Sequence, residues 1–251
     1  MKRDDSVVRP EHFVRYLRST VGLSALETRL PARAAIVFGK QDWRALRTML
    51  NAETLSWNRW ICVGRAGDRP VAVARSPIGA PATAITLEEM AALGAKEFLA
   101  FGVCGSLVPR LKIGDIVLPT FAESDEGTSR HYGVPGTARP TPALVRALRR
   151  AFDQRSLRYV AGGTWTMDAV YRETFARARA LAKRGVVAVE MEAAAIWAVA
   201  RHRRLRTASL FVVSDELGGE GWNPGFRHPA FLRGKRAALR ALVDVLSRDG
   251  P

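Results

Sequence analysis

Residues 187–195, Val-Ala-Val-Glu-Met-Glu-Ala-Ala-Ala, run from a buried strand directly into a helix. On both sides of this segment, apolar runs of strand length alternate with stretches that repeat apolar residues at helical spacing. Such alternation predicts the α/β class, with a mixed, largely parallel central sheet and helices on both of its faces. Ligands of such sheets bind at the carboxyl ends of the strands, so functional side chains are expected there.

The same patterns predict where the individual elements lie. We predict strands over residues 34–38, 60–64, 71–75, 97–103, 115–118, 162–171, 186–189 and 207–213. We predict helices over residues 42–50, 82–93, 142–152, 172–184, 190–203 and 229–246. Residues 119–142 are rich in Gly, Ser, Thr and Pro and predict a long loop. Residues 1–251 are expected to form a single domain, with residues 1–30 as an N-terminal helical extension.

The composition narrows the class of protein. The 251 residues are 47% hydrophobic and 25% charged, which is typical of a globular protein. Cys62 and Cys104 lie in apolar runs, so neither a disulfide framework nor a metal site is expected. The N-terminal residues lack the apolar stretch of a signal peptide, and no run is long enough to span a bilayer. We therefore expect a cytoplasmic protein without a membrane partner.

The net charge of +15 raises the question of a nucleic-acid partner. It comes from 33 arginines and only 6 lysines, which are dispersed over the polar faces of predicted helices. No basic stripe interleaved with aromatic residues is present, so nucleic-acid binding is the less favoured interpretation. An anionic small substrate would still benefit from this positive field.

Two glutamates flank a methionine where the strand at residues 186–189 becomes a helix. Acidic side chains near the first turn of a helix are favourable on electrostatic grounds alone, which accounts easily for one glutamate. It accounts less well for both Glu190 and Glu192 in so apolar a surround. Paired carboxylates at this place could hold the hydroxyl groups of a sugar.

Two further segments place polar or glycine residues directly after an apolar strand. Ser214 and Asp215 follow residues 207–213, and Asp215 is either a helix cap or an acid whose pKa is raised by burial. Gly102 and Gly105 follow residues 97–101, and closely spaced glycines let backbone amides approach an anion. Glycines also serve any tight turn, so this second signal is weak by itself.

In this order, the three segments resemble the nucleoside phosphorylase family, which includes purine nucleoside phosphorylases, uridine phosphorylases and the methylthioadenosine/adenosylhomocysteine nucleosidases. Residues 78–82, 88–94 and 112–115 match as well, and residues 126–132 and 166–171 are closest to the uridine phosphorylase branch. The resemblance covers about residues 34–246. It implies a three-layer phosphorylase-like fold. It also implies an enzyme that cleaves the N-glycosidic bond of a nucleoside by pentosyl transfer. Inorganic phosphate would be the co-substrate, with no other cofactor. It also implies a homo-oligomer, a dimer-based trimer or hexamer.

The resemblance implies a role for each matching residue. Glu192 would accept hydrogen bonds from the ribose hydroxyls, with Met191 under the sugar ring and Glu190 beside it. Asp215 would protonate the departing base, oriented by Ser214 and helped by Arg227. The remaining candidates are Val170, Tyr171 and Gly105 for the substrate, and Gly39, Arg44, Arg59 and Val103 for phosphate.

Departures from the family pattern keep two alternatives open. Ala100 and Val103 stand where phosphorolytic relatives carry an arginine and a Ser or Thr, and the turn at residues 39–44 has a different spacing. Water could therefore replace phosphate, which would make the protein a hydrolytic nucleosidase of the same fold. A non-catalytic protein that keeps Glu192 and Asp215 for nucleoside recognition is the other alternative. The pattern also leaves open whether the base is a purine or uracil.

Overall fold

The computed structural model describes residues 6–219 and 221–248. Its helices are α1 (Pro10–Ser19), α2 (Lys40–Met49), α3 (Ala80–Ala92), α4 (Pro142–Gln154), α5 (Phe175–Ala182), α6 (Ala193–Arg203) and α7 (Pro229–Ser247), with short 3-10 helices η1 (Ser129–Tyr132) and η2 (Val170–Arg172). Its strands are β1 (Arg33–Val37), β2 (Glu53–Leu55), β3 (Asn58–Ala66), β4 (Arg69–Arg75), β5 (Glu97–Ser106), β6 (Ile116–Asp125), β7 (Thr137–Ala138), β8 (Tyr159–Met167), β9 (Val186–Glu190), β10 (Arg206–Glu216) and β11 (Asn223–Pro224).

The sheet is organised around β5. This strand pairs in parallel with β1 and β10, and its last residues pair antiparallel with β9. From β10 the sheet runs through β6, β8 and β9 back to β5, so this half closes on itself, whereas β1, β4, β3 and β2 extend outward. The predicted mixed, largely parallel sheet is confirmed. Its closure was not predicted, because it depends on pairings between strands that are far apart in sequence.

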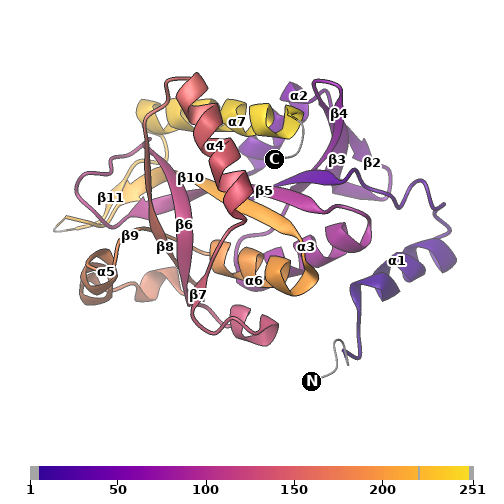
Figure 1. The fold of residues 1–251 in the computed structure, drawn as a ribbon, viewed down its shortest axis with the longest axis horizontal. Helices are drawn as coiled ribbons and strands as arrows, with labels where there is room; N and C mark the ends of the chain where they lie inside the picture. Colours follow the sequence, from indigo (N-terminus) through magenta and orange to yellow (C-terminus); the bar gives the residue numbers. More distant parts are fainter. Residues whose placement is uncertain (1–5, 220, 249–251) are drawn as a thin grey trace.

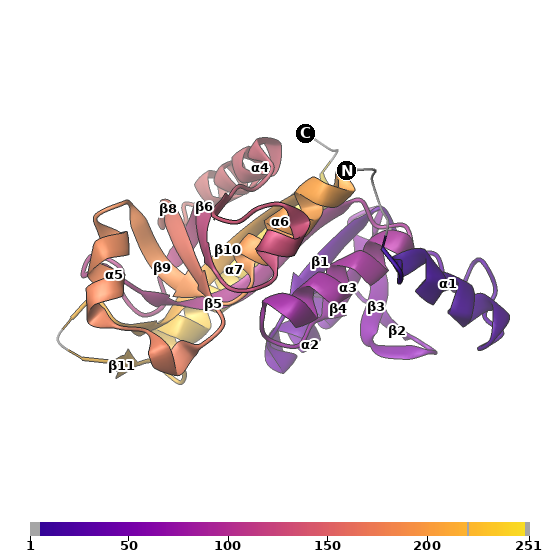
Figure 2. The ribbon, with the colours of Figure 1, turned by 90° about the horizontal axis from the view of Figure 1, so that it is seen from below.

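Helices cover both faces of the sheet, as predicted. Figure 1 shows α2, α4 and α7 above it and α3 and α6 below it. Apolar side chains of α2, α4 and α7 form one buried cluster with the strands, and those of α1, α3 and α6 form another on the opposite face. Figure 2 shows α5 and β11 at one end of an elongated molecule and α1 at the other. Within the described residues, none of the helices is both long and apolar enough to cross a membrane.

The predicted elements differ from the structure at several places. The short strands β2 and β11 were not predicted, and β5 and β10 extend past their predicted ends to Ser106 and Glu216. Residues 119–142 are not one loop, because β6 continues to Asp125 and pairs with β8, and η1 and β7 follow. Val170 and Tyr171 lie in η2 instead of ending a strand, and the helix expected over residues 172–184 spans only Phe175–Ala182. The helix expected from residue 190 begins at Ala193. Of the expected extension over residues 1–30, residues 1–5 lie outside the described residues, and α1 occupies Pro10–Ser19.

Candidate functional site

The ends of three strands meet at Gly105. In the sheet register Gly105 of β5 pairs with Asp215 of β10 on one side and with Val189 of β9 on the other. Because neighbouring strands lie about 4.8 Å apart, the two acidic segments are roughly 10 Å from each other. A Cβ atom on Gly105 would lie 2.3 Å from Leu217 Cδ1 and 3.1 Å from Val189 Cγ1, so a larger residue here would require the Leu217 side chain to move. The lack of a side chain at Gly105 thus allows close packing between β5 and the two segments.

Glu192 is buried at the start of α6 and faces the turn before α3. Its Oε1 accepts a hydrogen bond of 2.7 Å from the backbone N–H of Gly79, which has a φ of 104°. Burial, together with the charge of Glu190, raises the pKa of Glu192 to about 8. One carboxylate oxygen is thus fixed by the Gly79 N–H, and a backbone hydrogen bond from Met191 also acts to lower the pKa of this group.

Glu190 has a different environment from Glu192. Its Oε2 accepts hydrogen bonds of 2.7 Å from the backbone N–H groups of Glu192 and Ala193, and its Oε1 accepts from Thr166 Oγ1 at 2.5 Å and Thr164 Oγ1 at 3.3 Å. These bonds take up the first free N–H groups of α6, which is why the helix begins at Ala193. Glu190 therefore positions Glu192. The sequence had suggested that the oxygens of Glu190 contact a ligand, but these hydrogen bonds within the protein occupy them.

Asp215 is held by donors on both carboxylate oxygens. The Ser214 hydroxyl lies 2.6 Å from Oδ1, and the indole Nε1 of Trp222 donates to Oδ2 at 2.9 Å. The sequence predicted Ser214 as the orienting group, and the structure places it there. It predicted Arg227 as the second helper, but Arg227 is exposed and Trp222 makes that contact instead.

Cys104 shows that Glu190 and Asp215 approach the same interior point. Burial raises the pKa of its thiol well above the usual value, and the negative charges of Glu190 and Asp215 raise this pKa further. Cys104 pairs with Val213 next to Asp215, and its carbonyl oxygen is 3.2 Å from Ser214 Oγ. The segments that carry Glu190 and Asp215 thus lie on either side of one buried residue. The predicted meeting of Glu192 and Asp215 in one pocket stays a prediction.

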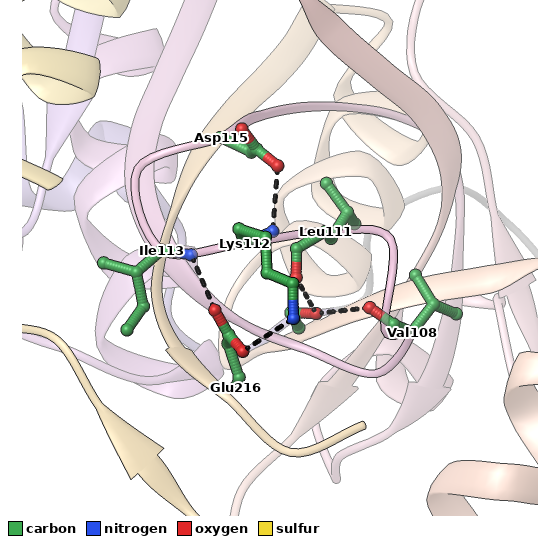
Figure 3. Close-up of polar contacts among 7 residues, drawn as sticks. Val108, Leu111, Lys112, Ile113, Asp115 and Glu216 are labelled. Atoms are coloured by element: carbon green, nitrogen blue, oxygen red, sulfur yellow. Dashed lines mark hydrogen bonds and ion pairs between the residues drawn. The ribbon is translucent and has the colours of Figure 1, made fainter. Parts of the chain in front are cut away.

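The turn at residues 112–115 supports the end of β10. Glu216 accepts a hydrogen bond of 3.1 Å from the Ile113 backbone N–H and lies 3.3 Å from Lys112 Nζ, while Asp115 accepts from the Lys112 N–H at 2.8 Å (Figure 3). Because Glu216 follows Asp215 directly, these contacts fix the backbone that carries Asp215. The motif at residues 112–115 therefore positions the site from outside it.

Glu173 is a candidate site residue that the sequence analysis missed. It is half-buried just after η2 and makes no hydrogen bond or ion pair through its side chain with any described residue. Burial first, and the nearby charge of Asp215 second, raise the pKa of Glu173 to about 7. An unpartnered carboxyl group beside Asp215 is suited to contact a ligand. No signal marked it in the sequence, because residue 173 falls in the first turn of the predicted helix over residues 172–184, where a glutamate is favourable on electrostatic grounds alone.

Aromatic and apolar side chains near these carboxyl groups are unusually exposed. Tyr171 is 96% exposed, Trp222 61% and Val170 49%, and Phe226 packs against Trp222 with ring centroids 6.4 Å apart. Met191, expected under the sugar, is half-buried between Glu190 and Glu192. Such a rim of apolar groups around buried acids is typical of an open site for a flat ring.

The residues predicted for phosphate lie on separate elements. Gly39 precedes α2, and a Cβ atom placed on it would lie 2.3 Å from Oδ2 of Asp42, a carboxylate that pairs with Lys235 at 2.7 Å. The Asp42 charge disfavours an anion directly at Gly39. Arg44 is exposed on α2, and Val103 is 37% exposed on β5.

Arg59, the fourth predicted phosphate ligand, lies on β3 with its guanidinium 5.0 Å from the centre of the Trp60 ring. Ala100 is buried in β5 and adds no charge to this end of the sheet. The described part of the chain contains no group of three or more His, Cys, Asp or Glu side chains placed to hold a metal ion.

Comparison with known proteins identifies the family. Residues 51–246 match the family model described as the phosphorylase superfamily, and the chain belongs to this family, as its motifs predicted. A uridine phosphorylase of Treponema pallidum is 30% identical over 214 residues, which cover 80% of this chain and 81% of that protein. A guanosine phosphorylase of Halorubrum lacusprofundi is 33% identical over 141 residues, but these span only 56% of this chain and 58% of its relative.

The fold is that of solved members of the family. The purine nucleoside phosphorylase of Toxoplasma gondii, solved in complex with immucillin-H, superposes with a TM-score of 0.79 over 88% of this chain and 92% of that chain, at 23% identity. This similarity confirms the predicted fold class, a single α/β domain with a mixed central sheet between helices.

Proposed function

We propose that the protein cleaves the N-glycosidic bond of a purine nucleoside by transferring the pentosyl group to inorganic phosphate. The observation that carries this proposal is the position of two acidic strand ends beside Gly105 of β5, which pairs with Asp215 of β10 and with Val189 of β9, three residues before Glu192. Membership of the phosphorylase superfamily supports the reaction type, and relatives named guanosine and uridine phosphorylase support a nucleoside substrate.

The chemistry of bond cleavage fits the two acids. As the C1′–N bond breaks, positive charge develops on the sugar and negative charge on the leaving base. Glu192 is held by the Gly79 N–H, and the ionised form of its carboxyl group accepts from the ribose hydroxyls and opposes the positive charge on the sugar. Asp215 lies on the other side, where a proton must reach the ring nitrogen of the base.

Glu173 supports a purine as the base. With a pKa of about 7 it keeps a proton beside Asp215 at neutral pH, and this proton is available to the departing ring. In the ionised form its two oxygens match two adjacent N–H donors, as on the edge of a 2-amino-6-oxopurine. Uracil offers one N–H between two carbonyl oxygens, which a carboxylate would repel. Among purine nucleosides we therefore expect guanosine to be preferred.

A product assay tests the reaction. The enzyme is incubated with guanosine, inosine, adenosine and uridine, each with and without inorganic phosphate, and free base and ribose 1-phosphate are quantified. We expect release of guanine that requires phosphate and yields ribose 1-phosphate in equal amount. Release without phosphate would identify a hydrolytic nucleosidase, in keeping with the lost arginine and hydroxyl at Ala100 and Val103. Tight binding without turnover would identify a binding protein.

We also propose a cellular location and an oligomeric state for the enzyme. The nature of the substrate supports a cytoplasmic location. The family resemblance and the open rim of the site, at which Tyr171 is 96% exposed, support a homo-oligomer, a dimer-based trimer or hexamer, in which a neighbouring subunit completes the pocket. Sedimentation analysis tests the subunit number.

A further inference from the structure

A cluster of two arginines and two tryptophans lies at the end of β4. We call Trp43, Arg59, Trp60 and Arg75 the arginine–tryptophan cluster. The guanidinium carbons of Arg75 and Arg59 lie 4.5 and 5.0 Å from the centre of the Trp60 ring, and Trp43 meets Trp60 edge-on at 6.4 Å between ring centroids. Two cations thus share one indole ring.

Arg75 stands level with the strand ends that form the site. In the parallel register, Val37 of β1 pairs with Arg75 on one side and with Phe101 of β5 on the other. Arg75 therefore lies two strands from residue 101, the neighbour of Ala100, at which phosphorolytic relatives carry their arginine. Four residues further along the chain, Gly79 holds Glu192. The cluster is thus connected directly to the sugar side of the site.

The charges of the cluster are not balanced by the protein. Arg75 is half-buried, and its Nε approaches only the Phe38 carbonyl oxygen, at 3.5 Å. Throughout the described ranges, neither Arg75 nor Arg59 forms an ion pair with a carboxylate. The nearest acid along α2, Asp42, is engaged by Lys235. Two like charges on one ring repel each other and favour a bound anion.

Trp43 provides an independent sign of a missing acceptor. It is 6% exposed, and its Nε1 has no hydrogen-bond partner in the structure. A buried N–H without an acceptor is costly, and an ordered water or a bound ligand can satisfy it. The oxygen of an anion held by the neighbouring arginines would satisfy this N–H.

We propose that the arginine–tryptophan cluster binds the phosphate co-substrate and that Arg75 supplies the guanidinium that Ala100 does not. This inference rests on the proposed phosphorolytic function and deepens it. Arg75 and Arg59 hold the dianion by charge-assisted hydrogen bonds, and Trp43 donates one more through its indole N–H. Trp60 keeps both guanidinium groups in place through cation–π contacts.

The test compares Arg75→Ala with Arg75→Lys, and uses Arg65→Ala on β3 as the matched control. The KM for phosphate is measured by guanine release at saturating guanosine, and guanosine affinity by calorimetry. We expect Arg75→Ala to raise the KM for phosphate by about 30-fold or more, since a lost charge-assisted contact has an effect of this order. Arg75→Lys should restore part of the loss, and guanosine affinity should stay unchanged. Arg65→Ala should behave like the wild type.

A second readout is independent of turnover. Inorganic phosphate that binds the native protein raises its melting temperature, and Arg75→Ala should lose this rise while keeping the wild-type melting temperature without phosphate. If guanine release needs no phosphate, the proposed function fails. In that case, a phosphate-induced rise in melting temperature that is lost in Arg75→Ala would still support the anion site. Two results would overturn the inference. One is an Arg75→Ala variant with an unchanged KM for phosphate and an unchanged phosphate-induced rise in melting temperature. The other is a wild-type protein whose melting temperature does not rise with phosphate.

Discussion

Glu192→Gln should make the protein more stable and less active at the same time. Glutamine keeps an oxygen that accepts from the Gly79 N–H, but it carries no charge at any pH. In the folded protein, burial and the neighbouring charge of Glu190 raise the pKa of Glu192 from 4.5 to about 8. At about 1.4 kcal/mol for each pH unit, this difference corresponds to roughly 5 kcal/mol as an upper limit.

The sign of the pH effect follows from this raised pKa. Below pH 4.5 the carboxyl group is protonated in both states, and its stabilising contribution is fully present. Between pH 4.5 and about 8 the folded protein binds the proton more tightly than the unfolded chain does, so stability falls as the pH rises. Above pH 8 the whole contribution is lost. Glutamine cannot lose a proton, so Glu192→Gln should lack this decline.

Urea unfolding at pH 6 and pH 9, followed by circular dichroism, measures the effect. We expect the gain in stability of Glu192→Gln over the wild type to be larger at pH 9 than at pH 6 by about 2 kcal/mol or more. At pH 9, where the wild-type Glu192 is ionised, the kcat/KM for guanosine should fall by about 100-fold or more, because the charge that opposes the cationic sugar is gone. Glu89→Gln, which removes a half-buried carboxyl group in α3 away from the site, should leave kcat/KM unchanged. A variant that is destabilised at pH 9 and keeps wild-type activity would refute the reasoning.

Other predictions concern the groups around the two acids. Asp215→Asn should lower kcat by about 100- to 1,000-fold with an unchanged circular dichroism spectrum, and wild-type turnover in the folded variant would contradict its role. Glu173→Gln should lower kcat/KM for guanosine by about 10-fold or more. It should also remove an ionisation near pH 7 from the pH–rate profile, since the pKa of Glu173 is about 7. If that ionisation persists in the variant, it belongs to another group. Thr166→Val should cost about 1–3 kcal/mol in urea unfolding, because it removes a 2.5 Å hydrogen bond to buried Glu190. A cost below about 0.5 kcal/mol would show that Glu190 does not depend on this donor.

Part of the site could be read from the chain because its signals are local. Glu190, Glu192 and Asp215 follow apolar strands directly, so their placement at strand ends depends only on hydrophobic periodicity and on the parallel arrangement that it predicts. The different roles of Glu190 and Glu192 could not be predicted from the local sequence. They depend on Thr164 and Thr166 of β8, which lie beside β9 only after the sheet has formed.

Other parts needed contacts between distant segments. Trp222 replaced Arg227 as the partner of Asp215 because the chain after β10 turns back as β11, a pairing that no periodicity predicts. Glu173 was hidden for the same reason, since its environment is set by Asp215 across the fold. Residues 119–125 were mistaken for loop because their polar composition hides a strand that is stabilised by pairing with β8.

The sequence by itself determined the α/β class, the alternation of elements and the acids at the ends of strands, because these follow from the period of apolar residues and from short motifs. Only the tertiary structure decided that the sheet closes through β5 and β10, that Glu192 is bonded to Gly79 and Glu190 to the start of α6, and that Arg75 stands level with Phe101. These features arise where segments up to about a hundred residues apart become neighbours, for example Cys104 and Ser214. Such proximity is fixed by the packing of the whole domain, which no single stretch of the chain encodes.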